Sequence, residues 1–202
     1  FAGRIIDQLN RRKNKVQYEV FAGVEPNPDI TTVKRGLDIM NTFKPNAIVA
    51  LGGGSPMDAA KIMWLFYERP DADFTELVQK FADIRKRTVK FPHLGQKAKF
   101  IAVPTTSGTG SEVTPFAVIS DKENDKKYPL ADYAITPHVA IVDPVLVQTV
   151  PARPTASTGM DVLTHATEAY TSILANDYTD GLALRAIKLV FENLEKSVKE
   201  FD

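Results

Sequence analysis

The hydrophobic and polar positions of the chain follow two periods, and each predicts a different element. Apolar residues recur at three- and four-residue spacing in Phe1–Leu9 and Ile30–Met40, which predicts amphipathic helices. Val16–Phe21 alternates like a half-buried strand, and Ala47–Leu51 is a short apolar run typical of a buried one. A helical pattern then runs to Glu68. The order strand, helix, strand, helix predicts a parallel sheet with helices on both faces.

The middle of the chain repeats these signals less regularly. Phe74–Ile84 has helical spacing, and Thr88–Lys99 is expected to be an excursion between elements. Three further apolar runs, Phe100–Val103, Phe116–Ile119 and Ala140–Val142, predict strands.

From Pro144 onward the β-branched runs give way to two long helical patterns, Thr155–Leu174 and Tyr178–Phe201. We therefore expect an α/β fold, with a Rossmann-like, parallel-sheet dinucleotide-binding domain over residues 1–150 and the beginning of an all-α domain over residues 151–202. The chain starts without a methionine and starts and stops in helical patterns, so a fragment of a longer protein is expected.

Composition narrows the class of function. The 25 basic and 25 acidic residues cancel, which argues against a nucleic-acid binder. There is no cysteine, so no disulfide or thiolate chemistry is available, and a cytoplasmic location is the expectation. No apolar run approaches the ~20 residues of a membrane span, so we expect no membrane association.

The most informative stretch is Leu51–Lys61, with sequence LGGGSPMDAAK. Three glycines lie at a predicted strand-to-helix corner, where Ser55 can cap the helix and Pro56 suits its first turn. Exposed backbone N–H groups at such a corner bind phosphate. The alternative is a tight turn that only requires glycine.

A second stretch rich in hydroxyl groups, Pro104–Glu112 with sequence PTTSGTGSE, follows a predicted strand directly and could contact ribose, phosphate or nicotinamide. The alternative is a Ser/Thr linker. Asn27, between two prolines, and Lys127, in a charged turn, could each face a ligand. Both residue types are more often ordinary loop or turn residues.

Among the three histidines, only His165 lies in a promising pattern. Asp161 and His165 are four residues apart on a predicted helix, so both side chains lie on the same face and can coordinate one cation. Glu168, one turn further, could orient His165. The alternative is a simple i,i+4 pair, because two ligands do not make a metal site. His93 is expected to be a surface histidine, and His138 a loop residue at the entry to a strand.

In combination these motifs are far more specific. GGGSPMDAAK, PTTSGTGSE and GMDVLTHATEAY, in this order, resemble the iron-containing (group III) alcohol dehydrogenases. Four further stretches resemble the alcohol dehydrogenase half of the bifunctional aldehyde-alcohol dehydrogenases: Phe43–Pro45, Met57–Trp64, Asp83–Pro92 and Lys127–Ala134.

This resemblance implies an enzyme that interconverts acetaldehyde and ethanol with NAD. It implies Fe²⁺, with Zn²⁺ as the alternative, bound by Asp161, His165 and two histidines that lie downstream in the family. The implied cofactor-binding residues are Asn27, Gly53, Gly54, Ser55, Pro56, Met57, Asp58, Thr105, Thr106, Thr114 and Lys127.

The family's first strand, which helps to select NAD over NADP, is not found in this sequence, and the piece alone is expected to be inactive. The resemblance also implies a homo-oligomer, and filaments if the chain belongs to a bifunctional enzyme. A zinc-dependent polyol or glycerol dehydrogenase and a non-catalytic cofactor-binding or assembly module are the two alternatives.

Overall fold

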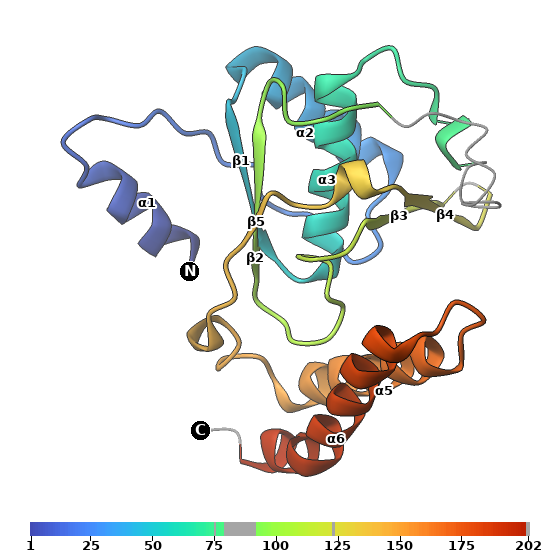
Figure 1. Ribbon diagram of the computed structural model, residues 1–202. Helices are drawn as coiled ribbons and strands as arrows, with labels where there is room; N and C mark the ends of the chain where they lie inside the picture. Colours follow the sequence, from blue (N-terminus) through green and yellow to red (C-terminus); the bar gives the residue numbers. More distant parts are fainter. Residues whose placement is uncertain (75, 79–91, 123, 201–202) are drawn as a thin grey trace. The chain divides into compact units, whose positions relative to one another are not determined.

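The computed structural model describes residues 1–74, 76–78, 92–122 and 124–200 (Figure 1). The chain divides into two compact units. The first comprises Phe1–Pro104 and Ser111–Val142, and the second comprises Thr105–Gly110 and Asp143–Asp202. The short segment Thr105–Gly110 thus belongs to the second unit although both its neighbours in sequence belong to the first.

A parallel sheet of order β1-β2-β5 organises the first unit. β1 (Ala47–Gly52) pairs with β2 (Lys99–Pro104), and β2 pairs with β5 (Val139–Ala140). The register sets the last residues of β1 and β2, Gly52 and Pro104, opposite each other. The two motif loops therefore leave the sheet at adjacent carboxyl ends. The predicted α/β class is confirmed. The third strand begins one residue before the run expected at Ala140–Val142 and ends two residues before its end.

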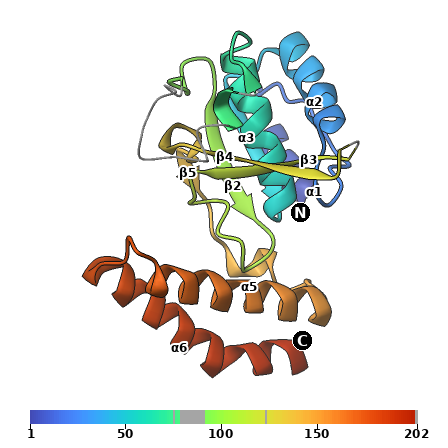
Figure 2. The ribbon, with the colours of Figure 1, turned by 90° about the vertical axis from the view of Figure 1, so that its right-hand side faces the viewer.

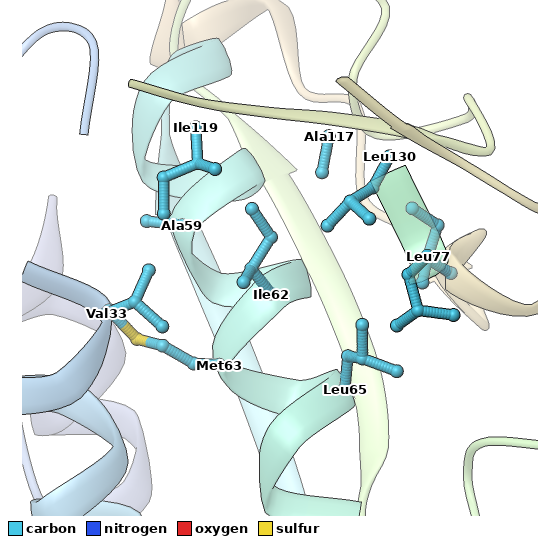
Figure 3. Packing of buried hydrophobic residues seen from close by; sticks show 10 residues of the cluster. Val33, Ala59, Ile62, Met63, Leu65, Leu77, Ala117, Ile119 and Leu130 are labelled. Carbon is cyan, nitrogen blue, oxygen red and sulfur yellow. The ribbon is translucent and has the colours of Figure 1, made fainter. Parts of the chain in front are cut away.

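Helix α3 (Gly54–Glu68) is the centre of this unit, and most of its residues from Met57 onward are buried. One side packs on the sheet in a cluster with Ala50, Phe100 and Ala102. The other side packs against α2 (Ile30–Phe43) and the hairpin of β3 (Phe116–Asp121) and β4 (Lys126–Ala131). Figure 3 shows the apolar side chains of this cluster packed together. Because α3 is covered on both sides, it has no polar face, as is typical of a helix buried in a core.

Strands β3 (Phe116–Asp121) and β4 (Lys126–Ala131) form an antiparallel hairpin separate from the parallel sheet. The strand expected at Phe116–Ile119 exists, but β4 and the antiparallel hairpin were not predicted. Pro129 of β4 pairs with Val118 of β3. Because proline has no backbone N–H to donate to a neighbouring strand, its presence in the sequence argues against a strand there. A two-stranded ribbon tolerates this proline because each strand has a free edge.

The prediction of a strand at Val16–Phe21 is wrong. These residues have no regular secondary structure, and Val16–Val20 are exposed. Alternation alone does not make a strand, which requires hydrogen bonds to a neighbour, and no strand in the described residues pairs with this segment. The flanking helices α1 (Ala2–Asn10) and α2 (Ile30–Phe43) agree with the predictions, and α2 ends at Phe43, with Lys44 as its C-cap residue just before Pro45.

Phe74 and residues 76–78 are helical, and the remainder of the predicted helix Phe74–Ile84 lies outside the described residues, as do residues 88–91 of the excursion. The chain returns to β2 through a segment held by Glu68, a buried carboxylate at the end of α3. Its oxygens accept hydrogen bonds from the backbone N–H groups of Gln96, Lys97 and Ala98 at 2.9–3.0 Å. This cage fixes where β2 begins.

The second unit contains α5 (Ala152–Thr171) and α6 (Asp177–Lys199), close to the predicted bounds, and the two helices lie side by side (Figure 2). Gly159 of α5 faces Leu194 of α6 so closely that an added Cβ atom would lie 2.2 Å from its Cδ1. The 3₁₀ turn η1 (Tyr133–Ile135) lies between β4 and β5, and η2 (Pro144–Leu146) lies between β5 and α5. In the described part of the chain, no helix combines the length and apolar character needed to cross a membrane.

Candidate cofactor and metal sites

The glycine corner has the geometry expected of an anion-binding turn. Gly52 has a φ of +151°, and a Cβ atom there would lie 2.8 Å from Pro56 Cγ, so only glycine fits. Gly53, not Ser55, is the N-cap residue of α3, so the prediction that Ser55 caps the helix is wrong. No side chain from the described residues caps this end. Backbone N–H groups of the first turn are therefore left for a ligand.

Ser55 has a different role, because it meets two other predicted residues. The Ser55 hydroxyl accepts a hydrogen bond from the backbone N–H of Asn27 at 3.3 Å. The Lys127 ammonium donates to Asn27 Oδ1 at 3.0 Å. Asn27 has a φ of 55°, in the left-handed region that asparagine tolerates better than most residues. Three residues separated widely in sequence thus converge on the first turn of α3.

A pocket of about 390 Å³ lies between the Asn27 loop and the β3–β4 hairpin. Its lining is strongly charged, with lysines alternating with aspartates: Pro26, Asn27, Ser120, Asp121, Lys122, Asp125, Lys126 and Lys127. The loop and hairpin are also joined through their backbones, because Ser120 N–H donates to Pro28 O at 2.8 Å. Such a lining suits a polar, anionic ligand better than an apolar one.

Asp58 faces inward and accepts hydrogen bonds from the Ser111 hydroxyl at 2.7 Å and from Val118 N–H at 3.1 Å. Burial raises the pKa of Asp58, and these two donors limit the rise. One turn later, the Lys61 ammonium donates to the carbonyl oxygens of Thr114 and Phe116, both at 2.8 Å. Lys61 is fully buried, and this burial lowers its pKa to about 8.

The remaining predicted cofactor residues occupy varied environments. Met57 is fully buried in the core, so only its backbone can face a ligand. Thr114 is half-buried and lies in the segment that Lys61 holds. Thr105 and Thr106 are half-buried in the loop that belongs to the second unit. In that loop, a Cβ atom on Gly108 would lie 2.5 Å from a backbone oxygen of α5, so the loop approaches this helix closely.

Asp161 and His165 lie on one face of α5, as the spacing predicts. The distance from His165 Nε2 to Asp161 Oδ1 is 3.6 Å, and both side chains are substantially exposed. The described residues contain no group of three or more potential metal ligands. This pair supplies one oxygen and one nitrogen donor, which suit a divalent transition metal, and two of the four ligands that the resemblance implies.

Sequence reasoning missed Lys61, Ser111 and Glu68. A signal for Lys61 and Glu68 exists, because both are charged residues in the part of α3 that follows Asp58, which is otherwise apolar on every side. A charged residue at such a position is buried and has to find partners elsewhere in the fold. Ser111 gave no comparable signal among its hydroxyl-bearing neighbours.

Comparison with known proteins decides the family. Residues 1–144 match the family model described as iron-containing alcohol dehydrogenase, and residues 155–202 match the C-terminal model of the same family. The chain belongs to the iron-containing alcohol dehydrogenase family. The resemblance inferred from the three motifs is thereby confirmed.

Among its relatives in this family is the aldehyde-alcohol dehydrogenase of Streptococcus pneumoniae serotype 4, with 73% identity over the whole chain. The bifunctional aldehyde-alcohol dehydrogenase of Escherichia coli K12 is 57% identical over 92% of the chain. The chain spans 23% and 21% of these two proteins.

A solved relative is the sulfoacetaldehyde reductase of Bifidobacterium kashiwanohense, crystallised with NAD⁺. It superposes with a TM-score of 0.82 at 37% identity, covering 99% of this chain and 50% of that one.

Proposed function

We propose that this chain is the cofactor-binding part and the beginning of the metal-binding part of an NADH-dependent alcohol dehydrogenase that interconverts acetaldehyde and ethanol. The proposed enzyme is bifunctional, like the bifunctional aldehyde-alcohol dehydrogenase of Escherichia coli. The observation that supports this best is the convergence of Asn27, Ser55 and Lys127 on the first turn of α3. The proposed domains are residues 1–150 and the helical region from residue 151.

In this proposal the free N–H groups at Gly53 and Gly54 bind the pyrophosphate of NADH. Lys127 supplies positive charge to a phosphate or donates to a ribose hydroxyl, and Asn27 orients Lys127 through its amide oxygen. Thr105, Thr106 and Thr114 offer hydroxyl groups for the nicotinamide end.

The metal in this proposal is Fe²⁺, and Asp161 with His165 provides two of its ligands. These two residues would hold a divalent metal ion, whose chemistry when bound would be Lewis-acid polarisation of the aldehyde carbonyl oxygen. The spacing of the pair on one helix face presents both donors to the same side. Aspartate and histidine also bind Zn²⁺, so identity of the metal is a separate question from its position.

The test uses the intact protein and compares Asp161→Ala and His165→Ala with His93→Ala, a matched change at an exposed histidine. NADH oxidation with acetaldehyde should be lost in the first two and unchanged in the control. NADH affinity, measured by fluorescence titration, should be retained in all three. Full activity in either α5 variant would refute the metal assignment, and absence of NADH binding in the wild type would refute the function.

Reconstitution identifies the metal. The metal-free protein is supplied with Fe²⁺ or Zn²⁺ alone, and acetaldehyde reduction is measured anaerobically. We expect activity with Fe²⁺. Activity with Zn²⁺ alone would favour the zinc-dependent alternative.

A further inference from the structure

Lys61 is fully buried in the middle of α3, at a position where an apolar residue would avoid the cost of removing a charge from water. Its ammonium donates to the carbonyl oxygens of Thr114 and Phe116. Hydrogen bonds from a charged donor are roughly twice as strong as neutral ones, so the contact is a specific tether between helix and loop.

Asp58 completes the tether from the preceding turn of the helix. Its carboxylate accepts from Ser111 and Val118, so it holds the two ends of the segment whose middle Lys61 holds. Two opposite charges on α3 thus make four hydrogen bonds with residues 111–118, two donated by Lys61 and two accepted by Asp58. We call this arrangement the Asp58–Lys61 clamp.

The clamp joins the two halves of the proposed cofactor site. The first turn of α3 carries the glycine corner and Ser55, while the clamped segment leads directly into the hairpin that carries Lys127. Lys127 reaches Asn27 only if the hairpin keeps its place relative to α3. We propose that Lys61 is a positioning residue for cofactor binding, which holds the Lys127 hairpin against the phosphate-binding helix. This inference rests on the proposed function.

The clamp should respond to pH. Burial lowers the pKa of Lys61 to about 8, and the negative charges of Asp58 on the same helix and Glu112 in the adjoining segment limit the fall. Above that pH the ammonium becomes a neutral amine, which still donates hydrogen bonds but more weakly. NADH binding should therefore weaken as the pH rises through 8, by about threefold to tenfold.

The experiment measures the dissociation constant of NADH for the intact protein from pH 6.5 to 9.5, by fluorescence titration. Wild type is compared with Lys61→Met, which keeps the length of the side chain without its charge, and with Lys61→Arg, which stays charged throughout. Lys188→Met, at an exposed ion pair on α6, is the control and should follow the wild type.

For Lys61→Met we expect about tenfold weaker binding at pH 7 and no step near pH 8, with an unchanged circular dichroism spectrum. Lys61→Arg should lose the step and restore part of the affinity, which a residue with a merely structural role would not do. A folded Lys61→Met protein with wild-type affinity and the same step would overturn the inference and leave the proposed function standing.

If Lys61→Met does not fold, the wild-type profile decides, and constant affinity between pH 7 and 9 would overturn the inference. Absence of NADH binding in every protein, wild type included, would instead overturn the proposed function and the inference with it.

Discussion

Replacing Glu68 should destabilise the first unit more than any exposed glutamate would. Glu68 Oε1 accepts from Lys97 N–H and Ala98 N–H at 2.9 Å and from the Trp64 indole at 3.3 Å, while Oε2 accepts from Gln96 N–H at 3.0 Å. Glu68→Ala removes the acceptor of the three backbone N–H groups, of which Ala98 N–H is buried, whereas the Trp64 indole keeps Ala98 O as an acceptor at 3.0 Å. Hydrogen bonds to charged groups contribute about 1.5–3 kcal/mol each, but such losses do not add fully. We expect about 3–5 kcal/mol.

Glu68→Gln should cost less, about 1–3 kcal/mol, because an amide oxygen in place of Oε1 keeps three donors and only Gln96 N–H then faces an amide nitrogen. The assay is urea unfolding of the intact protein followed by the fluorescence of Trp64, which contacts this site. Glu195→Ala, at a side chain that is 79% exposed, is the matched control and should change stability by less than about 0.5 kcal/mol.

The same carboxylate gives a pH dependence with a defined sign. Burial alone would raise the pKa of Glu68, but its hydrogen bonds, chiefly from the backbone N–H groups, outweigh burial, and the pKa lies below its ordinary value of 4.5. The stabilisation is therefore complete above pH 4.5 and is lost as the pH falls through the lowered value. Wild type and Glu68→Gln should converge in stability on acidification. A Glu68→Ala protein within 1 kcal/mol of wild type at neutral pH, with the same urea dependence, would refute this account.

The other predictions concern three glycines and Lys127. Gly52→Ala should lower the free energy of unfolding by about 1–3 kcal/mol and weaken NADH binding, because Gly52 has a φ of +151° and its Cβ would contact Pro56. Gly181→Ala, on an open face of α6, should instead stabilise the helix by about 0.5–1 kcal/mol and raise the melting temperature. Gly108→Ala should lower the melting temperature of the second unit, since a Cβ atom would lie 2.5 Å from a backbone oxygen; an unchanged melting temperature would contradict the close packing. Lys127→Met should raise the dissociation constant of NADH about tenfold with unchanged unfolding, and equal affinity would exclude it from the site.

The sequence predicted the elements whose signals are local. Strands β1 and β2, helices α2, α3, α5 and α6, and the glycine corner follow from periodicity and from turn residues that act within a few positions. The position of Asp161 and His165 on the same face of α5 followed from helix geometry alone. Family membership followed from three motifs that are individually weak and jointly specific.

The failures have a common physical cause, which is dependence on distant partners. Val16–Phe21 alternates correctly but has no strand beside it, and β4 pairs across a proline that lowers its strand signal. The partners of Ser55 and Lys61 lie 28 to 55 residues away, so periodicity could not reveal them. Burial of a charged residue was the only available signal, and it requires knowing that α3 is covered on all sides.

The loop Thr105–Gly110 has a consequence for how the chain is made. It follows β2 directly, yet it belongs with the helical unit and packs against α5. A ribosome releases this loop well before α5, so β1, β2 and the hairpin can fold while the loop still lacks its packing partner. The second motif loop should therefore become ordered late in synthesis. For the same reason, no single cut in the gene separates the two units cleanly.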